Sequence, residues 1–159
     1  MDYLWSPWRY RYIASEGKSE GCVFCDAIAA NDDPATLVVF RGEKNFIILN
    51  RYPYTSGHVM VVPYAHLADL PAVPPETLSE MMFLAQRART ALEKTYHPEG
   101  YNLGMNLGRA AGAGIVGHLH LHVLPRWAGD ANFMTVIGET RVEPEELSTT
   151  FTRLRDALA

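Results

Sequence analysis

The 159-residue sequence contains only two cysteines, no long apolar run and no surplus of basic residues. A transmembrane helix needs about 18 or more consecutive apolar residues. The stretch "MDYLWSPWRYRYIASEG" carries charges, proline and aromatics where a secretory signal needs an apolar run. The formal net charge of -4 argues against a nucleic-acid or anionic-membrane binder, because such proteins use basic residues to pair with phosphates. We therefore expect a cytoplasmic protein that binds neither nucleic acid nor membranes.

Internal repeats, low-complexity tracts and Ser/Gly linkers are also missing, so the segments are parts of one fold. The 48% hydrophobic and 20% charged residues are typical of an ordinary globular protein, and the length favours one domain. We predict a single domain over residues 1–159. Its core extends from about 22 to 137, between an N-terminal aromatic segment at 1–21 and a C-terminal helix at 144–158.

Five β-rich runs separated by turn signals predict strands. They lie at residues 36–41, 45–50, 57–63, 101–108 and 118–124. The first two are joined by "GEK", a short turn with glycine that favours a hairpin. Proline is expected to stop the third strand at Pro63 and the fifth at Pro125.

Two helices are predicted from apolar residues at helical spacing. The first extends over 77–97 behind prolines suited to a helix start, and the second lies at 144–158. Their predicted core-facing residues are Leu78, Met81, Met82, Ala85, Ala88 and Leu92 in the first, and Leu147, Phe151, Leu154 and Leu158 in the second. Antiparallel strands with helices of unequal length predict an α+β fold with about five strands, one long helix and a C-terminal helix.

Half of the six histidines fall within "GHLHLHVLPRW", as His118, His120 and His122. Side chains alternate along a strand, so the three histidines share one face at ~6.6 Å intervals. The apolar residues between them then face the core. Imidazole titrates near neutrality, so clustered imidazoles can supply a nucleophile, a proton donor and an orienting partner. Their mutual repulsion lowers each pKa and favours an unprotonated nucleophile.

Two other interpretations of this run stay open from the residues alone. The histidines can simply occupy the solvent-exposed face of a strand. They can also bind one zinc ion with an open position, although three side chains spread along a line make such coordination awkward.

The two cysteines, Cys22 and Cys25, form a Cys-x-x-Cys pair. In a reducing compartment this spacing indicates a metal site or a redox pair rather than a structural disulfide. Two buried free thiols are the alternative.

The stretch "HLHLHVLPRW" resembles the signature of the histidine triad (HIT) superfamily. Its continuation "HVLPRWAGD" resembles the fragile-histidine-triad branch of dinucleoside polyphosphate hydrolases. With "GDANF" it resembles even more the bacterial HIT-family diadenosine tetraphosphate phosphorylases. The resemblance also takes in "LWSPWRYRYI", "GCVFC", "FIILNRYPYTSGHVMVVPYAH" and "GYNLGMNLGRAAGAG". It implies a HIT-like fold and a homodimer with pooled central strands.

In that superfamily the middle histidine attacks the α-phosphorus of a nucleotide and forms a nucleotidyl-histidine intermediate. The resemblance therefore implies that His120 is the nucleophile. It implies that His122 polarises a phosphate oxygen and that His58 completes the site from a neighbouring strand. The first histidine of the triad is His118.

The resemblance also implies a nucleotide-binding set. Asn50 matches the ribose contact, and Trp127 is placed to stack on an adenine. The expected base pocket and phosphate loop contain Phe46, Ile48, Asn106, Gly112, Ala113 and Gly114. From residue type alone Asn50 fits turn chemistry, the glycine segment fits a flexible connector, and Trp127 fits core packing.

A second set is similar to a zinc site found in many bacterial histidine triad proteins. Its ligands here are Cys22, Cys25, His66 and His118. Two thiolates and two imidazoles complete a tetrahedral zinc site without an open position, so the metal is expected to be structural. Iron is an alternative by ligand type.

The resemblance thus implies an enzyme that cleaves diadenosine tetraphosphate or a related dinucleoside polyphosphate. Inorganic phosphate or water accepts the nucleotidyl group. The loop "GAGIV" lacks the glutamine of the fragile-histidine-triad hydrolases, which leaves room for phosphate as acceptor. The alternatives are a nucleoside phosphoramidate hydrolase and a nucleotide-binding module with little turnover.

Overall fold

A computed structural model describes residues 21–130 and 145–159 of the chain. Its strands are β1 Val38–Arg41, β2 Asn45–Leu49, β3 Val59–Pro63, β4 Gly100–Gly104 and β5 Leu121–Arg126. Its α-helices are α2 Val23–Ala29, α3 Asp33–Thr36, α4 Pro75–Tyr96 and α6 Leu147–Leu158, and two short 3-10 turns are η2 Leu70–Ala72 and η3 Arg109–Ala111.

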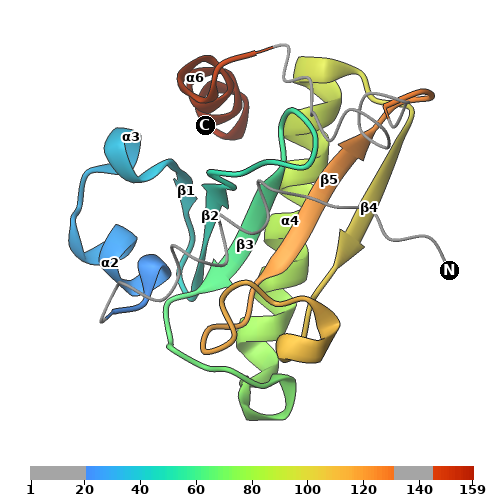
Figure 1. Cartoon of the computed structure of the whole chain (residues 1–159). Helices are drawn as coiled ribbons and strands as arrows, with labels where there is room; N and C mark the ends of the chain where they lie inside the picture. Colours follow the sequence, from blue (N-terminus) through green and yellow to red (C-terminus); the bar gives the residue numbers. More distant parts are fainter. Residues whose placement is uncertain (1–20, 131–144) are drawn as a thin grey trace, which may run out of the picture.

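The five strands form one antiparallel sheet in the order β1-β2-β3-β5-β4. Helix α4 lies across one face of the sheet, and α6 packs beside it against β1 (Figure 1). This arrangement confirms the predicted α+β fold, including the β1–β2 hairpin. None of the helices in the two described ranges is long and apolar enough to cross a bilayer.

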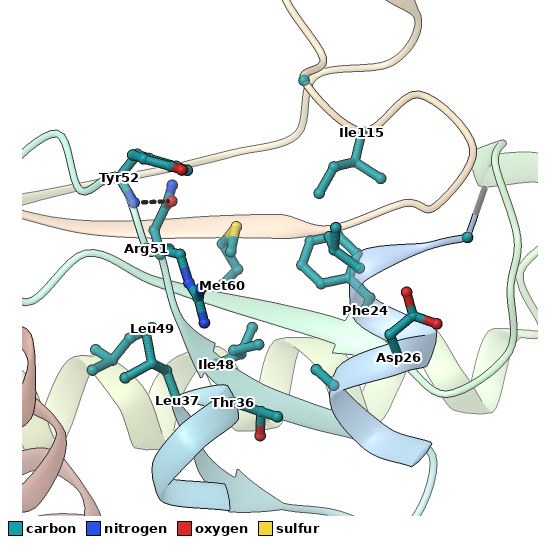
Figure 2. Close-up of a pocket in the computed structure, with 15 residues that line it drawn as sticks. Phe24, Asp26, Thr36, Leu37, Ile48, Leu49, Arg51, Tyr52, Met60 and Ile115 are labelled. Atoms are coloured by element: carbon teal, nitrogen blue, oxygen red, sulfur yellow. Dashed lines mark hydrogen bonds between the residues drawn. The ribbon is translucent and has the colours of Figure 1, made fainter. Parts of the chain in front are cut away.

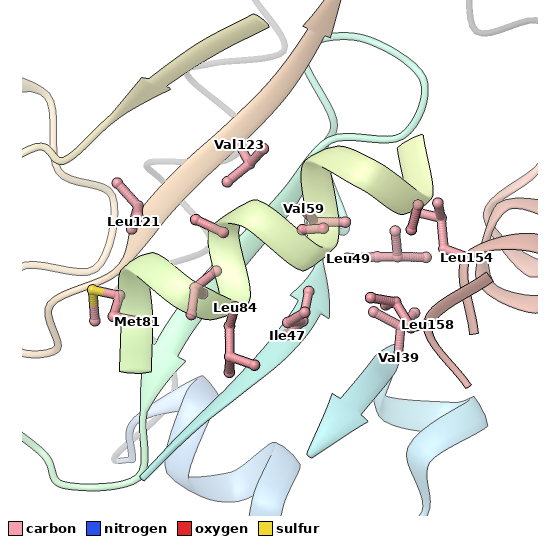
Figure 3. Close-up of a cluster of buried hydrophobic side chains, with 14 of the residues drawn as sticks. Val39, Ile47, Leu49, Val59, Met81, Leu84, Leu121, Val123, Leu154 and Leu158 are labelled. Carbon is pink, nitrogen blue, oxygen red and sulfur yellow. The ribbon is translucent and has the colours of Figure 1, made fainter. Parts of the chain in front are cut away.

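The main core lies between the sheet and α4 (Figure 3). Alternate residues of β2, β3 and β5 face this helix because successive strand side chains point to opposite faces. The cluster includes Ile47, Leu49, Val59, Val61, Leu121 and Val123 from the strands and Met81, Leu84, Ala88 and Leu92 from the helix. The predicted inward direction of Leu119, Leu121 and Val123 is therefore confirmed.

The opposite face of β2 and β3 is also buried. There, Phe24 and Ala27 of α2 pack against Phe46, Ile48, Met60 and Val62. Because β2 and β3 are covered on both faces, every residue in each of them is buried, and apart from Asn45 their sequences are apolar rather than alternating. The second layer brings α2 to the face that carries the histidines.

The predicted stripe of the long helix is right at most positions but wrong at Met82, whose residue is 52% exposed. Leu84 is buried instead. At about 100° per residue, Met82 points well away from the common direction of the buried residues Met81, Leu84, Ala85, Ala88 and Leu92. In α6 the predicted residues Phe151, Leu154 and Leu158 are buried.

Helix boundaries differ from the predictions by a few residues. Helix α4 begins at Pro75, because proline suits the first turn of a helix, and ends at Tyr96, before His97, whose φ of 47° is left-handed. Helix α6 begins at Leu147 rather than at 144. The N-terminal aromatic segment lies outside the described residues except for Gly21, and the single-domain organisation stays a prediction.

The fifth strand differs more clearly from its prediction. It begins at Leu121 rather than at residue 118, and it continues through Pro125 to Arg126. Pairing with β3 ends at the Val59–Val123 pair, and beyond it the Pro125 carbonyl accepts a hydrogen bond from Thr55 Oγ1 on that side. The missing N–H of proline therefore removes no bond of the ladder. Strand β4 likewise ends at Gly104, not at residue 108.

Helices α2 and α3 were not predicted. With seven and four residues, they are too short for apolar periodicity to appear. A local signal does exist for α3, because Asp32 caps its N-terminus, accepting from Ala35 N, and a proline follows in the first turn.

The β1–β2 hairpin is fixed to α4 by one carboxylate. Glu80 accepts hydrogen bonds from the backbone N–H groups of Glu43 at 2.7 Å and Lys44 at 2.8 Å, and from Asn45 Nδ2 at 2.7 Å. Burial by itself raises the pKa of Glu80, but these hydrogen bonds outweigh it and leave the pKa below its usual value. The hairpin turn is thus attached to the main core.

Replacement of Leu92 by alanine should lower the free energy of unfolding by about 2–5 kcal/mol, because the residue is fully buried and its loss leaves a cavity. The matched change Met82→Ala, on the exposed side of the same helix, should cost roughly 0.5 kcal/mol or less. Urea denaturation followed by circular dichroism measures both. Equal losses for the two variants would contradict this description of the core.

Candidate functional site

Four histidines meet on the α2 side of the sheet. His58 precedes β3, His122 lies in β5, and His118 and His120 lie in the segment that leads into β5. Their residues are between 1% and 8% exposed. The interpretation of a solvent-exposed histidine face is therefore wrong.

One chain of hydrogen bonds fixes the protons of His58 and His122. The backbone N–H of Tyr54 donates to His58 Nδ1 at 3.1 Å, so the proton of this neutral ring is on Nε2. That nitrogen lies 2.9 Å from His122 Nδ1 and donates to it. Because His122 Nδ1 accepts this hydrogen bond, the proton of His122 is on Nε2. This N–H is available to donate to a ligand.

His120 has the opposite tautomer. Its Nδ1 lies 2.8 Å from the backbone carbonyl oxygen of His118, and a carbonyl can only accept, so the proton is on Nδ1. Nε2 of His120 therefore carries a free lone pair. The ring stands edge-on to His122 with centroids 4.9 Å apart and packs on Phe24 at 5.2 Å.

Burial keeps these imidazoles neutral. Burial, together with repulsion from the charged form of the neighbouring His120, lowers the pKa of His122 to about 4. Burial also lowers the pKa of His120, while the His118 carbonyl acts in the opposite direction. A neutral imidazole with a lone pair is the form that attacks an electrophile.

A second cluster contains Cys22, Cys25, His66 and His118, whose ligand atoms all lie within 4.8 Å of one another. His118 Nε2 donates to the Pro63 carbonyl at 2.8 Å, which leaves its Nδ1 with a lone pair. That Nδ1 lies 3.2 Å from Cys22 Sγ and 3.7 Å from Cys25 Sγ. His66 Nδ1 lies 3.4 Å from Cys25 Sγ.

These distances fit a tetrahedral metal centre. Zinc bonds of about 2.0–2.3 Å to nitrogen and sulfur place neighbouring ligand atoms about 3.3–3.8 Å apart. Two sulfur and two nitrogen donors are a set that zinc prefers. Both cysteines are half-buried free thiols, and the cluster brings together all four residues of the predicted metal site.

The alternative metal site formed by the three triad histidines is not supported. Among the described residues, one group of histidines, cysteines or carboxylates can hold an ion, and it consists of Cys22, Cys25, His66 and His118. His120 is turned toward the His118 carbonyl and His122 toward His58. The triad is thus divided between two centres.

A cleft of about 610 Å³ lies on the α2 side of the sheet (Figure 2), and none of the four histidines is among its lining residues. It is connected to them through Phe24, which packs on His120, and through Met60, which pairs with His122 across the sheet. Its apolar walls include Phe24, Leu37, Ile48, Leu49, Met60 and Ile115, and its polar residues include Asp26, Thr36, Asn50 and Arg51.

Asn50 stands where the cleft meets the histidines. Its Oδ1 accepts from the backbone N–H of Tyr52 at 3.0 Å, as in a local turn. Its Nδ2 lies 3.4 Å from His58 Nδ1. The turn chemistry expected from residue type is therefore present, and the side chain also lines the cleft.

Only part of the predicted nucleotide-binding set lines the cleft. Ile48 and Gly114 do so, whereas Phe46 packs under it against Tyr64, with ring centroids 5.4 Å apart. Trp127 follows β5, and its backbone N–H donates to Asp130 at 3.1 Å. The remaining residues, Asn106, Gly112 and Ala113, lie in the loop between β4 and β5 and are not among the lining residues.

Sequence reasoning missed the contribution of α2 to the cleft. Phe24, Asp26 and Ala27 line it, and Phe24 lies between the two cysteines of the predicted metal site. Because metal ligands fix their local backbone, the residues between them were a signal that this segment is held in a defined place.

The HIT domain family matches residues 32–129, and the chain belongs to this family. An AP-4-A phosphorylase of Mycobacterium tuberculosis (strain ATCC 25618 / H37Rv) is 39% identical to it over 158 residues, which cover 94% of this chain and 80% of that protein. The family and this relative support an enzyme of the HIT type that processes nucleotides.

Solved structures agree with this assignment. A zinc-bound histidine triad family protein from Mycobacterium smegmatis has a TM-score of 0.71 and 32% identity, and it covers 87% of this chain and 93% of that one. A hypothetical histidine triad nucleotide-binding protein from Sulfolobus tokodaii strain7 has a TM-score of 0.70 and 27% identity, over 86% and 91%. The predicted HIT-like fold is confirmed. The zinc-bound neighbour and the Cys/His cluster together indicate zinc.

Long-range ¹H–¹⁵N spectra of histidine-labelled protein should show Nδ1–H for His120 but Nε2–H for His58 and His122. Since the pKa of His122 is about 4, its signals should keep the shifts of neutral imidazole down to roughly pH 5. An Nε2–H tautomer for His120 would contradict the hydrogen-bond assignment, and protonation of His122 near pH 6 would contradict the lowered pKa.

Proposed function

We propose that this protein cleaves a phosphoanhydride bond of diadenosine tetraphosphate, or of a related dinucleoside polyphosphate, through a nucleotidyl-His120 intermediate. The observation that carries the proposal is the opposite tautomers of two adjacent buried histidines. His120 offers a lone pair and His122 an N–H, in two rings whose centroids lie 4.9 Å apart. One ring can attack phosphorus while the other donates to a phosphate oxygen.

In the first step His120 Nε2 attacks the α-phosphorus of diadenosine tetraphosphate. A P–N bond forms, the bond from this phosphorus to the bridging oxygen breaks, and ATP leaves. The N–H of His122 donates to a phosphate oxygen and stabilises the negative charge that develops there. Because His120 keeps its Nδ1 proton, the attached ring becomes cationic and is a good leaving group.

In the second step an oxygen of inorganic phosphate, or of water, attacks the same phosphorus and the P–N bond breaks. Phosphate yields ADP, and water yields AMP. Dividing one displacement into two lets the first product leave before the acceptor arrives. The AP-4-A phosphorylase relative favours phosphate as the acceptor.

The cleft is proposed to hold the nucleoside. Its volume of about 610 Å³ is in the range of small-molecule sites. Asn50, which lines the cleft beside His58, is proposed to contact the ribose, and Ile48 is proposed to contribute to the base pocket. The predicted phosphate contacts of the β4–β5 loop, the stacking role of Trp127, the homodimer and the cytoplasmic location stay predictions.

The metal is proposed to be a structural zinc ion. When bound, it supplies a rigid link between its four ligands rather than an open coordination position. His118 then has two functions, because its side chain is a ligand while its carbonyl orients His120. The metal site therefore helps to orient His120, the proposed nucleophile.

Incubation with diadenosine tetraphosphate, followed by chromatography of the products, tests the reaction. ADP plus ATP should appear only when inorganic phosphate is present, and His120→Ala should lower the rate roughly a thousandfold or more because the intermediate cannot form. The exposed His97, outside both clusters, provides a control in His97→Asn, which should keep the wild-type rate.

The other outcomes distinguish the alternatives. AMP plus ATP without phosphate identifies a hydrolase of the same mechanism. Equal activity of His120→Ala and wild type would refute the covalent mechanism. Binding of AMP without cleavage of any dinucleotide would identify a binding module, and cleavage of nucleoside phosphoramidates alone would identify a phosphoramidate hydrolase.

Elemental analysis should find about one zinc ion per chain in the wild type, since four ligands complete one tetrahedral site. His66→Asn should lower the zinc content and the thermal midpoint. The matched variant His97→Asn also replaces an exposed histidine, and it should retain both. Full zinc content in His66→Asn would exclude His66 as a ligand.

A further inference from the structure

Asp26 is the acidic side chain in the wall of the cleft. Within the described part of the chain its carboxylate has no hydrogen-bond or ion-pair partner. It lies close to the backbone of Gly21, where a Cβ atom would be 3.0 Å from Asp26 Oδ2. A carboxylate with unused acceptor capacity therefore borders the cleft.

Apolar side chains separate the Asp26 carboxylate from the opposite end of the cleft. Phe24, Ile48 and Met60 form an apolar wall between it and the end of the cleft where Arg51 and Tyr52 lie (Figure 2). Thr36 also lines the cleft, but its hydroxyl already donates to the Asp32 carbonyl at 2.8 Å. An apolar molecule held by these walls reaches Asp26 at the end farthest from Arg51.

The position of Asp26 is well fixed for an exposed residue. It follows Cys25 directly, and its backbone N–H donates to the Cys22 carbonyl at 2.9 Å. The neighbours Phe24 and Ala27 are buried in the core beneath α2. The predicted metal site at Cys22 and Cys25 and the core beneath α2 thus fix the helix turn that carries the Asp26 carboxylate.

We propose that Asp26 is a specificity-determining residue that accepts a hydrogen bond from the exocyclic amino group of a purine base. The inference rests on the proposed function, in which the ribose lies near Asn50 and the base occupies the apolar part of the cleft. An ionised carboxylate can only accept. It therefore favours a base edge that bears an amino group and disfavours one that presents only acceptors.

The test compares monophosphates that differ by one amino group. Isothermal titration calorimetry measures the dissociation constants of AMP and purine riboside monophosphate, and of GMP and inosine monophosphate. The wild-type protein should bind the amino-bearing member of at least one pair roughly five- to tenfold more tightly, as a hydrogen bond to a charged group allows. In Asp26→Ala this ratio should fall to about one.

Two control measurements test whether Asp26→Ala changes nucleotide binding indirectly. Purine riboside monophosphate should bind Asp26→Ala and wild type within about twofold, which reports an intact cleft. The matched variant Asp156→Ala changes an exposed aspartate on α6 that does not line the cleft, and it should keep the wild-type ratio.

The outcomes separate this proposal from the proposed function. If nucleotides bind but the wild type shows no preference within either pair, or if the preference survives in Asp26→Ala, the role of Asp26 is refuted and the nucleotide cleft stands. If none of the four monophosphates binds, both proposals fail.

Discussion

The arrangement of both centres depends on the hydrogen bond from His118 Nε2 to the carbonyl oxygen of Pro63, at 2.8 Å. This bond fixes the imidazole in one tautomer and directs its Nδ1 toward the two sulfur atoms. The backbone carbonyl of the same residue accepts from His120. A single residue therefore determines, through its side chain, which of its nitrogens faces the metal cluster and, through its backbone carbonyl, which nitrogen of His120 is left with a lone pair.

The two buried faces of β2 and β3 explain why such a site can exist in so small a chain. One face packs on α4, and the other packs on α2. Burial on the α2 side removes water from His120 and His122 and keeps them neutral. The layer that stabilises the fold is thus also the layer that keeps the imidazoles uncharged.

Much of this organisation could be predicted from the sequence. The alternation through His118, His120 and His122 indicated a polar and an apolar face, and the apolar face is buried as expected. The long helix was visible from its period, because twenty-two residues give several repeats of an apolar stripe. Both kinds of signal are local in the sequence.

Other features depend on contacts between distant segments, and the sequence could not predict them. The tautomer of His58 depends on the Tyr54 amide, whose direction follows from the shape of the turn. Pro125 continues a strand because the pairing of β5 with β3 stops at Val123, before the proline. Phe46 lies on the same face of β2 as Ile48, so alternation along the strand could not indicate that only Ile48 lines the cleft.

Gly57 connects these layers in another way. It has a φ of 79°, and a Cβ atom there would lie 2.8 Å from Leu92 and 3.2 Å from Tyr96, both on α4. The next residue is His58, so the end of α4 is in van der Waals contact with the turn that positions this histidine. Leu92 and Tyr96 therefore cannot be enlarged without displacing Gly57, the residue before His58, so these two positions of α4 are constrained by the chemistry on the other side of the sheet.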